Sequence, residues 1–546
     1  MARTTEMRLM EIVVLQDDVS CVIELLGNKG NFEFQPAGNE GAGVTPLKEL
    51  YDKLQSVRAY LGMDDLPAYR EDSHFPQGAD IEHAQLIIKS VEELRHQEAG
   101  LPVEDEGASA RKELTAAINS CLDAHGKELE RLLGCLTIGA HVQQVESSLE
   151  SSGILYKISG WLPLADVKSI VEDLDSLTAG RVSICLYRPE EVASVAAGEE
   201  KVPVHFKHNK FVASFERMLF SYGSPQYGSI DATPLMAFFF PLLFGIMFGD
   251  AGQGLVLLLI GVLLSTGAIK RFPTWNKFGP IFMAVGCTST IMGVLTGEFF
   301  ANNKILVPLS RFISGLWGEP HDHILHLMPS ADTIGTVFMF FGFTLAIGFI
   351  MNSIGLVINM INQFSLGKPY KAIFGKTGLC GAVFFWYVVF MAIRVAVLGI
   401  PLFVGDWIVI GVSLLGACFG HPIERMLKKE KPVFEHGVGV GIIEGVVEIL
   451  EIVSSYLSNT VSFLRVGAFG LAHAVLGFII HTMAEMLGGA GGLAVMIIGN
   501  GIVIVLEGMI VAIQVVRLHY YEFFSKFFTE TGREFKPFRF QYNVKV

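Results

Sequence analysis

The feature that most constrains this 546-residue chain is a series of long apolar stretches in its C-terminal part. A helix that spans a bilayer needs about 20 predominantly apolar residues, and eight stretches approach or exceed that length. They cover residues 234–249, 251–269, 278–300, 334–361, 379–399, 402–420, 441–487 and 492–525. Only 17% of the chain is charged, against about a quarter in a soluble protein. We therefore expect an α-helical membrane domain of about eight transmembrane helices.

The last two stretches are longer than a perpendicular span requires. The stretch 441–487 corresponds to roughly 70 Å of α-helix, so it must tilt, kink or extend beyond the bilayer. Lys and Arg gather in alternate loops, at 270–277, 362–378 and 421–440, whereas the short intervening loops have none. By the positive-inside rule, this alternation predicts a multi-pass protein with both termini in the cytoplasm.

Charge also divides the chain into two parts. Residues 1–230 contain 36 acidic and 21 basic side chains, whereas residues 231–546 contain 18 and 20. An acidic domain argues against nucleic acid as a partner, because nucleic-acid binding needs a basic surface. It fits either docking to basic partner surfaces or an ordinary solvated surface. Residues 1–16 resemble a strand and lack the apolar segment of a signal peptide, so we expect residues 1–230 to stay in the cytoplasm.

This cytoplasmic domain is predicted to consist of two small α/β lobes, near residues 7–35 and 154–187, joined by a helical rod at 81–150. In the first strand, Met10, Ile12 and Val14 fall on one side. In the rod, apolar residues at helical spacing predict two helices that pair as an antiparallel hairpin. They are Ile81, Leu86, Ile87, Val91 and Leu94 in the first helix and Leu114, Ile118, Cys121, Leu129, Leu132 and Leu136 in the second. Such an arrangement suits a strut better than a catalytic pocket.

The most informative polar residues lie within the stretch 441–487. Seven of them recur at alternating spacings of four and three residues and therefore share one helical face. They are Glu444, Glu448, Glu451, Ser455, Ser458, Ser462 and Arg465. An arginine near the centre of a membrane helix costs at least about 2.5–3.5 kcal/mol, so we expect Arg465 to have a carboxylate partner or a water-filled cavity. The alternative is that the glutamates belong to a cytoplasmic extension and the serines only pack against other helices.

The stretch 492–525 has a similar pattern. Polar residues recur every seven positions at Asn500, Glu507, Gln514 and Tyr521, and Arg517 follows Glu507 by ten. Two long helices with acids and arginines among their polar positions predict a shared hydrophilic path. Arg517 also fits an anchor at the cytoplasmic headgroups. His473, about 12 Å beyond Arg465 along the helix axis, either joins the path or is a packing histidine.

No catalytic, metal or cofactor motif is evident in the sequence. The seven cysteines have no CxxC pair and no metal-ligand spacing. The segment 374–377 resembles the end of a phosphate-binding loop, but the required first glycine is replaced by Tyr370. We interpret His321, His323 and His326 as loop surface on the outer side rather than a zinc site. The chain is expected to bind no cofactor and not to hydrolyse nucleotide itself.

Seven segments along nearly the whole chain form a specific set. They are Gly160–Pro163, Tyr222–Pro225 with Tyr227, Phe240–Asp250, Gly297–Phe300, Ser462–Ala474, Arg517–Glu522 and Phe535–Phe538. Together they resemble the membrane-embedded stator subunit of V-type and A-type rotary ATPases, called subunit a in V-type enzymes and subunit I in prokaryotic ones. The short N-terminal half resembles the prokaryotic type, which implies a location in the plasma membrane.

The resemblance implies that the last two long helices face a rotating ring of small proteolipids, each with one ion-carrying carboxylate. Nine residues are accordingly assigned to ion translocation: Arg465, Arg517, Glu451, Glu507, His473, Ser458, Ser462, Gln514 and Asn459. Arg465 resembles the essential arginine and Arg517 its helper, while Glu451 and Glu507 match half-channel positions. At Asn459 and Gln514 the eukaryotic relatives have histidines, so a proton relay through those two positions is in doubt.

The resemblance also implies partners other than the lipid bilayer. These are the proteolipid ring, peripheral-stalk subunits of the E and G/H types, and a central-stalk cap subunit of the d/C type. Protons or sodium ions would be carried, and other subunits would handle ATP. Two other classes remain open: a secondary ion-coupled transporter with Arg465, Glu451 and Glu507 at its site, and a membrane-anchored scaffold, which would leave Arg465 unexplained.

Overall fold

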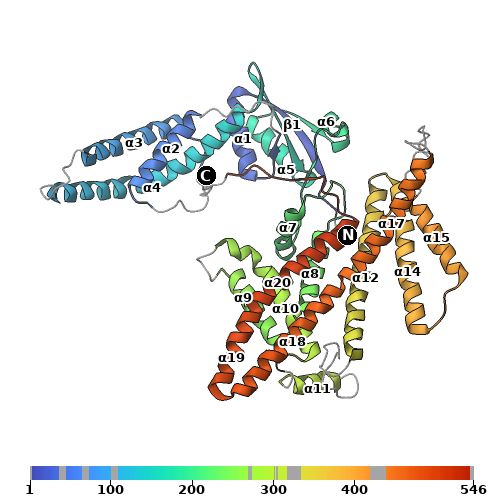
Figure 1. Ribbon diagram of the computed structural model, residues 1–546. Helices are drawn as coiled ribbons and strands as arrows, with labels where there is room; N and C mark the ends of the chain where they lie inside the picture. Colours follow the sequence, from blue (N-terminus) through green and yellow to red (C-terminus); the bar gives the residue numbers. More distant parts are fainter. Residues whose placement is uncertain are drawn as a thin grey trace. The chain divides into compact units, whose positions relative to one another are not determined.

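The computed structural model describes residues 3–35, 45–63, 73–99, 108–267, 273–300, 302, 305–315, 334–418 and 438–540. The chain forms two compact units (Figure 1). The sheet unit comprises Thr5–His205 and Arg533–Val546, and the helical unit comprises Met1–Thr4 and Phe206–Gly532. His321, His323 and His326 lie outside the described residues.

The sheet unit is built on one antiparallel sheet. Its strands are β1 (Met7–Leu15), β2 (Glu33–Phe34), β3 (Glu150–Ser152), β4 (Leu155–Pro163) and β5 (Ser183–Tyr187). They are ordered β2-β4-β1-β5, and β3 pairs with the outer part of β4. All nine residues of β1 pair with β4. The prediction of two separate lobes is therefore wrong, because a two-stranded unit is marginal by itself and the strands of both segments complete one sheet.

Helices α1 (Gln16–Lys29) and α5 (Leu164–Thr178) contribute to the core of this sheet. Met10, Ile12 and Val14 lie in that core with less than 2% exposure, which confirms the predicted alternation along β1. The end of the chain also belongs to this unit, because β7 (Arg533–Glu534) pairs in parallel with β6 (Pro203–Val204). Short helical turns Pro189–Glu191 and α6 (Ala193–Ala196) connect β5 to β6.

The predicted rod contains two helices, α3 (Gly78–Ala99) and α4 (Ala108–Ser147), and a third helix, α2 (Pro46–Tyr60), runs alongside them (Figure 1). The predicted Ile87, Val91, Leu129, Leu132 and Leu136 are buried in their shared core. The predicted Leu86 is 64% exposed, because Ala84, Ile87, Ile88 and Val91 define the face of α3 that packs. Leu54 and Val57 of α2 complete the core.

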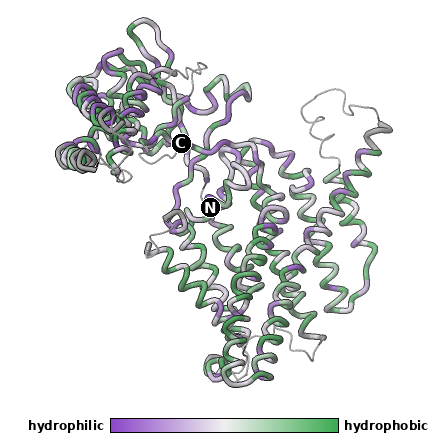
Figure 2. The backbone as a smooth tube through the Cα atoms, turned by 60° about the vertical axis from the view of Figure 1, so that its left-hand side comes forward, coloured by the Kyte–Doolittle hydropathy of each residue, from purple (hydrophilic) through white to green (hydrophobic). Residues whose placement is uncertain are grey.

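The helical unit begins with α7 (Lys210–Tyr222) and continues almost entirely as helices. Its further elements are α8 (Thr233–Met247), α9 (Ala251–Ser265), Pro273–Phe278, α10 (Gly279–Thr296), α11 (Val307–Gly315), α12 (Ile334–Ser365), α13 (Pro369–Phe374), α14 (Leu379–Leu398), α15 (Val404–Cys418), α17 (Val438–Ser462), α18 (Leu464–Leu487), α19 (Gly489–Ile502), η4 (Val503–Glu507), α20 (Gly508–Arg517), η5 (Leu518–Phe523) and η6 (Phe524–Lys526). Figure 2 shows their predominantly hydrophobic residues in green.

Five helices among the described residues are long and apolar enough to cross a membrane: Trp275–Thr296, Val337–Ser365, Pro369–Ala396, Ile443–Leu487 and Gly489–Lys526. Three shorter apolar helices, α8, α9 and α15, occupy the other predicted stretches. The protein is thus an integral membrane protein with a small N-terminal α/β region.

Glycines let α9 and α10 approach each other unusually closely. A Cβ atom on Gly293 would lie 2.0 Å from the Ala251 nitrogen, and one on Gly286 would lie 2.4 Å from the Leu258 nitrogen. Small residues at such positions are the usual means of close helix packing in a membrane. Just before α9, the Asp250 carboxylate caps the helix by accepting hydrogen bonds from the Gly252 and Gln253 nitrogens at 2.8 and 3.0 Å.

The last two long helices are not regular. The predicted continuous stretch 441–487 is interrupted at Phe463, where α17 ends and α18 begins. The stretch 492–525 contains two π-helical segments, η4 and η5. Because the predicted seven-residue stripe assumed a regular α-helix, it does not persist: Asn500 and Glu507 are buried, whereas Tyr521 is 67% exposed. Interruptions of this kind are frequently found at functional sites.

Candidate functional site

The break at Phe463 brings three polar side chains together. Arg465, near the start of α18, donates a hydrogen bond from Nη2 to Ser462 Oγ at 3.1 Å. Ser462, the last residue of α17, donates its hydroxyl proton to Glu522 Oε1 on η5. Glu522 is 6% exposed. The carboxylate nearest in this chain of hydrogen bonds is therefore Glu522, reached through a serine, rather than Glu451 or Glu507.

Arg517 lies in the same region. Both Arg517 and Glu522 interact electrostatically with the Arg465 guanidinium. Arg517 is exposed and Arg465 half-buried, with its Nη1 atom buried and without a hydrogen-bond partner among the described residues. We call the four residues Ser462, Arg465, Arg517 and Glu522 the arginine cluster. It combines two fixed positive charges with one buried carboxyl group.

A second polar group lies further along α18. His473 Nδ1 is 2.9 Å from Glu507 Oε2 on η4, and the two side chains are only 3% and 9% exposed. Glu298 and Asp250 also interact electrostatically with His473, and the ring of Phe248 lies 4.8 Å from its ring. We call His473, Glu507, Glu298 and Asp250 the histidine cluster. Three acids around one imidazole provide groups that can accept or donate protons deep within the helices.

A polar contact next to the histidine cluster ties α9 to α19. Gln253 Nε2 donates to Asn500 Oδ1 at 2.8 Å, and both residues are almost fully buried. The Gln253 side chain belongs to the same helical turn that Asp250 caps. A buried amide pair of this kind fixes helix positions, because an unpaired amide in an apolar interior is costly.

The remaining predicted residues are more dispersed. Glu451 lies on the exposed side of α17, where its Oε1 is 2.6 Å from Lys376 Nζ and both side chains are more than half exposed. Ser458 is exposed and Asn459 half-buried. Gln514 is half-buried, and its Oε1 has no hydrogen-bond partner among the described residues. The structure thus unites Ser462, Arg465 and Arg517, unites His473 and Glu507, and leaves the others apart.

Sequence reasoning missed Glu522, Glu298 and Asp250 as parts of these clusters. One signal was available: each is an acid within or beside an apolar stretch, where a charged group is expensive and is therefore expected to have a partner. The spacing of residues along one helix could not identify these acids as contact partners, because the contacts join residues on different helices. Among the described residues, no group of three or more His, Cys, Asp and Glu side chains is arranged to hold a metal ion.

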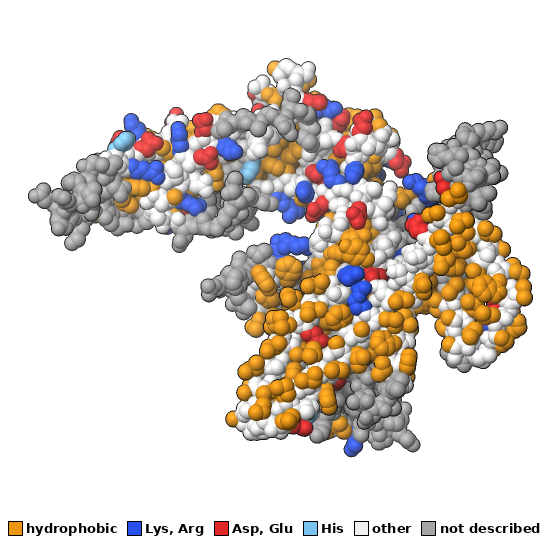
Figure 3. Space-filling model, viewed as in Figure 1, with side chains coloured by type: hydrophobic (Ala, Val, Ile, Leu, Met, Phe, Trp, Pro, Cys, Tyr) orange, Lys and Arg blue, Asp and Glu red, His pale blue; other side chains and the backbone are white. Residues whose placement is uncertain are grey.

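The exposed face beside the arginine cluster is apolar. Figure 3 shows hydrophobic side chains over α18, α19 and α20, with few charged groups between them. Large exposed apolar residues between α18 and α20 include Phe478, Ile479, Met483, Ile497, Ile498, Val505, Leu506, Met509, Ile510 and Ile513. This surface suits lipid or the apolar helices of another membrane protein.

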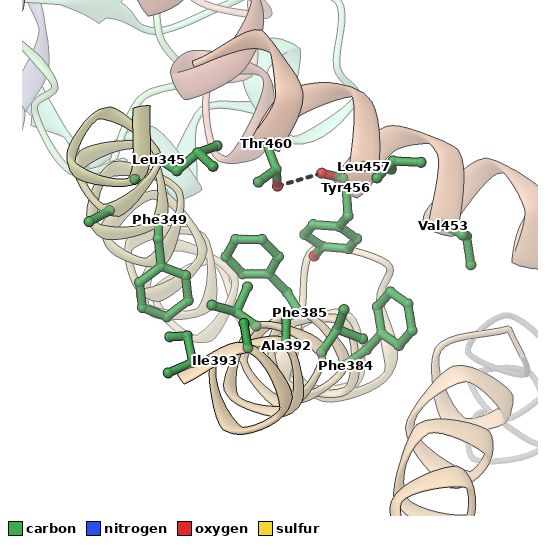
Figure 4. A pocket seen from close by; sticks show the side chains of 15 residues that line it. Leu345, Phe349, Phe384, Phe385, Ala392, Ile393, Val453, Tyr456, Leu457 and Thr460 are labelled. Carbon is green, nitrogen blue, oxygen red and sulfur yellow. Dashed lines mark hydrogen bonds between the residues drawn. The ribbon is translucent and has the colours of Figure 1, made fainter. Parts of the chain in front are cut away.

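An apolar groove lies in the helical unit between α12, α14 and α17 (Figure 4). It encloses about 650 Å³. Tyr456 of its wall stacks on Phe385 with ring centroids 5.2 Å apart, while its hydroxyl donates to the Lys376 carbonyl at 3.0 Å. Thr460 donates to the Tyr456 carbonyl at 2.7 Å. The hydroxyl protons of these two residues are thus donated within the protein, and the other residues that line the groove are apolar.

The fold and these clusters define an integral membrane protein with charged groups held at the break of one long helix. Residues 113–293 and 423–540 match the model of the V-type ATPase 116kDa subunit family, and the chain belongs to this family. It is 38% identical over 398 residues to V-type ATP synthase subunit I 2 of Treponema pallidum, covering 70% of this chain and 88% of that protein.

More distant relatives are longer than this chain. The A-type ATP synthase subunit I of Pyrococcus horikoshii is 27% identical over 407 residues, covering 72% of this chain and 55% of that protein. The corresponding protein of Methanocaldococcus jannaschii is 26% identical over 450 residues, covering 79% and 62%. The chain therefore spans little more than half the length of these archaeal relatives.

Proposed function

We propose that this chain is the non-catalytic membrane stator subunit of a V/A-type rotary ATPase and forms two ion half-channels against a proteolipid ring. The observation that carries the proposal is Arg465, which lies midway along the 45-residue apolar span Ile443–Leu487, two residues after the break at Phe463. Its hydrogen bond to Ser462 and its charged neighbours on η5 and α20 support a role at the site of ion transfer. Membership of a V-type ATPase subunit family supports the same function.

The proposed topology has eight transmembrane helices, with both termini in the cytoplasm. Five long helices and three shorter apolar ones support that number. In this arrangement residues 1–230 form the cytoplasmic strut and residues 231–546 the translocation domain. The acidic strut docks to peripheral-stalk subunits of the E and G/H types, and the cap subunit of the central stalk and the proteolipid ring complete its partners.

Two polar groups on either side of Arg465 provide the proposed half-channels. Glu451 precedes Arg465 by 14 residues, roughly 21 Å of helix, on the side of the basic loop that contains Lys376. His473 follows Arg465 by about 12 Å in the opposite direction, and it is paired with Glu507. An ion enters through one group and leaves through the other, and the ring carries it between them.

Arg465 separates the two paths. A guanidinium remains protonated under all physiological conditions, so it favours the ionised form of a carboxylate that passes it. The same fixed charge opposes direct passage of a cation from one half-channel to the other. Ion transfer therefore requires rotation of the ring. Each charge moved across 100 mV corresponds to about 2.3 kcal/mol, so several transfers accompany each ATP.

The test replaces Arg465 by alanine in the assembled complex. We expect ATP-driven ion uptake into vesicles to be lost while the complex still assembles, and Glu444→Ala, an exposed position on α17, to have a much smaller effect. Normal uptake by a well-assembled Arg465→Ala complex would refute the assignment. Ion uptake by the purified chain without ring or ATPase subunits would instead support a secondary transporter.

A further inference from the structure

Glu522 has an unusual position for an acid in an apolar segment. Its side chain is 6% exposed, and its Oε1 atom receives the hydroxyl proton of Ser462. On the basis of the proposed function, we propose that Glu522 is a positioning residue that acts through Ser462 to hold the Arg465 guanidinium in place for the ring carboxylate. Glu522 itself does not exchange ions in this proposal.

The direction of the hydrogen bonds supports this role. A serine hydroxyl has one proton to donate and two lone pairs to accept with. Ser462 donates to Glu522 and accepts from Arg465 Nη2. A carboxylate acceptor polarises the hydroxyl and strengthens the bond that its oxygen accepts. Without Glu522, the Ser462 proton is free to turn elsewhere and the contact with Arg465 loses its fixed orientation.

The charges around Glu522 also support this positioning role. Arg465, Arg517 and Lys526 all interact electrostatically with its carboxyl group. The Lys526 ammonium lies 4.6 Å above the ring of Tyr456 on α17. Three cations, from α18, α20 and η6, thus act on the one Glu522 carboxyl group. Removing its charge leaves the repulsion between Arg465 and Arg517 without a neighbouring negative charge to offset it.

The irregular backbone explains how these groups meet. In an α-helix, residues five positions apart, such as Arg517 and Glu522, lie about 140° apart around the axis. A π-helix bonds residue i to residue i+5, so residues at that spacing lie on about the same face. The π-helical segment η5 begins at Leu518, immediately after Arg517, and includes Glu522. The π segment therefore turns Glu522 toward the face that Arg517 occupies.

The break in the other helix completes the arrangement. Phe463 separates α17 from α18 and is fully buried, and a Cβ atom on Gly348 of α12 would lie 2.4 Å from its ring. This close contact fixes the break between Ser462 and Arg465. Two local departures from α-helical geometry, on opposite sides of the contact, thus converge on the same hydrogen-bonded chain.

The experiment compares Glu522→Gln, Glu522→Asp, Ser462→Ala and the double variant Ser462→Ala/Glu522→Gln in the assembled complex reconstituted into vesicles. The measured quantity is ion uptake per ATP hydrolysed. We expect Glu522→Gln to lower this ratio at least about tenfold, because the hydrogen bond from the Ser462 hydroxyl to a charged carboxylate becomes a weaker bond to a neutral amide. Glu522→Asp should restore part of the ratio. Since both residues act through one chain, Ser462→Ala should have a similar effect and the double variant should be no worse than either single variant.

A matched control is Glu485→Gln, at an exposed acid elsewhere on α18, which should leave the ratio unchanged. If Glu522→Gln pumps with the normal ratio, or if its effect multiplies with that of Ser462→Ala, the inference is overturned. Arg465→Ala separates a failure of the proposed function from a failure of the positioning role. Normal pumping by Arg465→Ala overturns the proposed function. Loss of pumping in Arg465→Ala together with normal pumping in Glu522→Gln overturns only the positioning role. If Glu522→Gln does not assemble, Ser462→Ala and Glu522→Asp give the same decision.

Discussion

The close contact of α9 and α10 leads to a quantitative prediction about Gly293. A Cβ atom there would lie 2.0 Å from the backbone nitrogen of Ala251, and ordinary contact begins at 3.4 Å. Gly293→Ala must therefore displace one helix by about 1.4 Å. The Ala251 nitrogen is a backbone atom, so it cannot move aside as the end of a flexible side chain could. Overpacking of this kind typically costs about 1–3 kcal/mol.

The displacement reaches the histidine cluster. Ala251 directly follows Asp250, and its nitrogen donates to the Glu298 carbonyl at 3.0 Å. Both acids interact with His473. Misplacement by about 1 Å can reduce the rate of a reaction that depends on precise geometry by about 100-fold. We expect Gly293→Ala to lower the unfolding midpoint of the purified complex and to reduce ATP-driven ion uptake at least tenfold.

Gly342→Ala is the matched control, because a Cβ atom at this position on α12 meets nothing within 4 Å. We expect its midpoint and uptake to equal those of the unmodified chain. A Gly293→Ala complex that keeps both values would show that α9 and α10 do not pack as closely as described, and the reasoning would fail. Equal losses in both variants would mean that any added methyl group in these helices is harmful.

Three further predictions concern other parts of the molecule. His208 lies between Glu216 and Asp231; burial opposes its charge, but the hydrogen bonds to the two carboxylates outweigh burial and raise its pKa from 6.5 to about 9. The stabilisation is complete below pH 6.5 and is lost between pH 6.5 and 9. The unfolding midpoint should therefore fall over that range in the unmodified chain but not in His208→Gln. The same pH dependence of the midpoint in both proteins would contradict this prediction. Ile12→Ala should destabilise the sheet unit by about 2–5 kcal/mol and make its strands more sensitive to limited proteolysis, whereas exposed Leu86→Ala should not. Glu507→Gln should reduce ion uptake without changing ATP hydrolysis in detergent, and unchanged uptake would remove Glu507 from the proposed path.

Local sequence patterns predicted the helices and strands of this protein better than they predicted which of these elements pair or pack together. The alternation in β1 and the helical spacing in α4 identify buried residues because each depends only on neighbours in the chain. The merging of two predicted lobes into one sheet depends on pairing between β1 and β4, which are separated by about 140 residues. The packing of α2 beside α3 and α4 was not predicted, because its two fully buried residues, Leu54 and Val57, stand among many charged side chains.

The candidate site shows the same division. The cost of a charge in an apolar helix predicted that Arg465 would have either a carboxylate partner or a water-filled cavity. The spacing of residues did not identify Glu522, because a break at Phe463 and a π-helical segment rotate the groups out of their regular positions. The pair formed by His473 and Glu507 joins two helices, and no pattern within either helix reveals the register between them.

The division of the chain into units has a mechanical consequence. The polypeptide crosses from one unit to the other three times, after Thr4, after His205 and after Gly532. Its beginning is held in the helical unit, where the Gly228 nitrogen donates to Thr4 Oγ1 at 3.0 Å, and its end is held in the sheet unit, where Phe538 and Phe540 contact the core. Three covalent connections therefore join the two units, rather than a single linker. In the proposed stator role, three connections of this kind would resist rotation of either unit better than one.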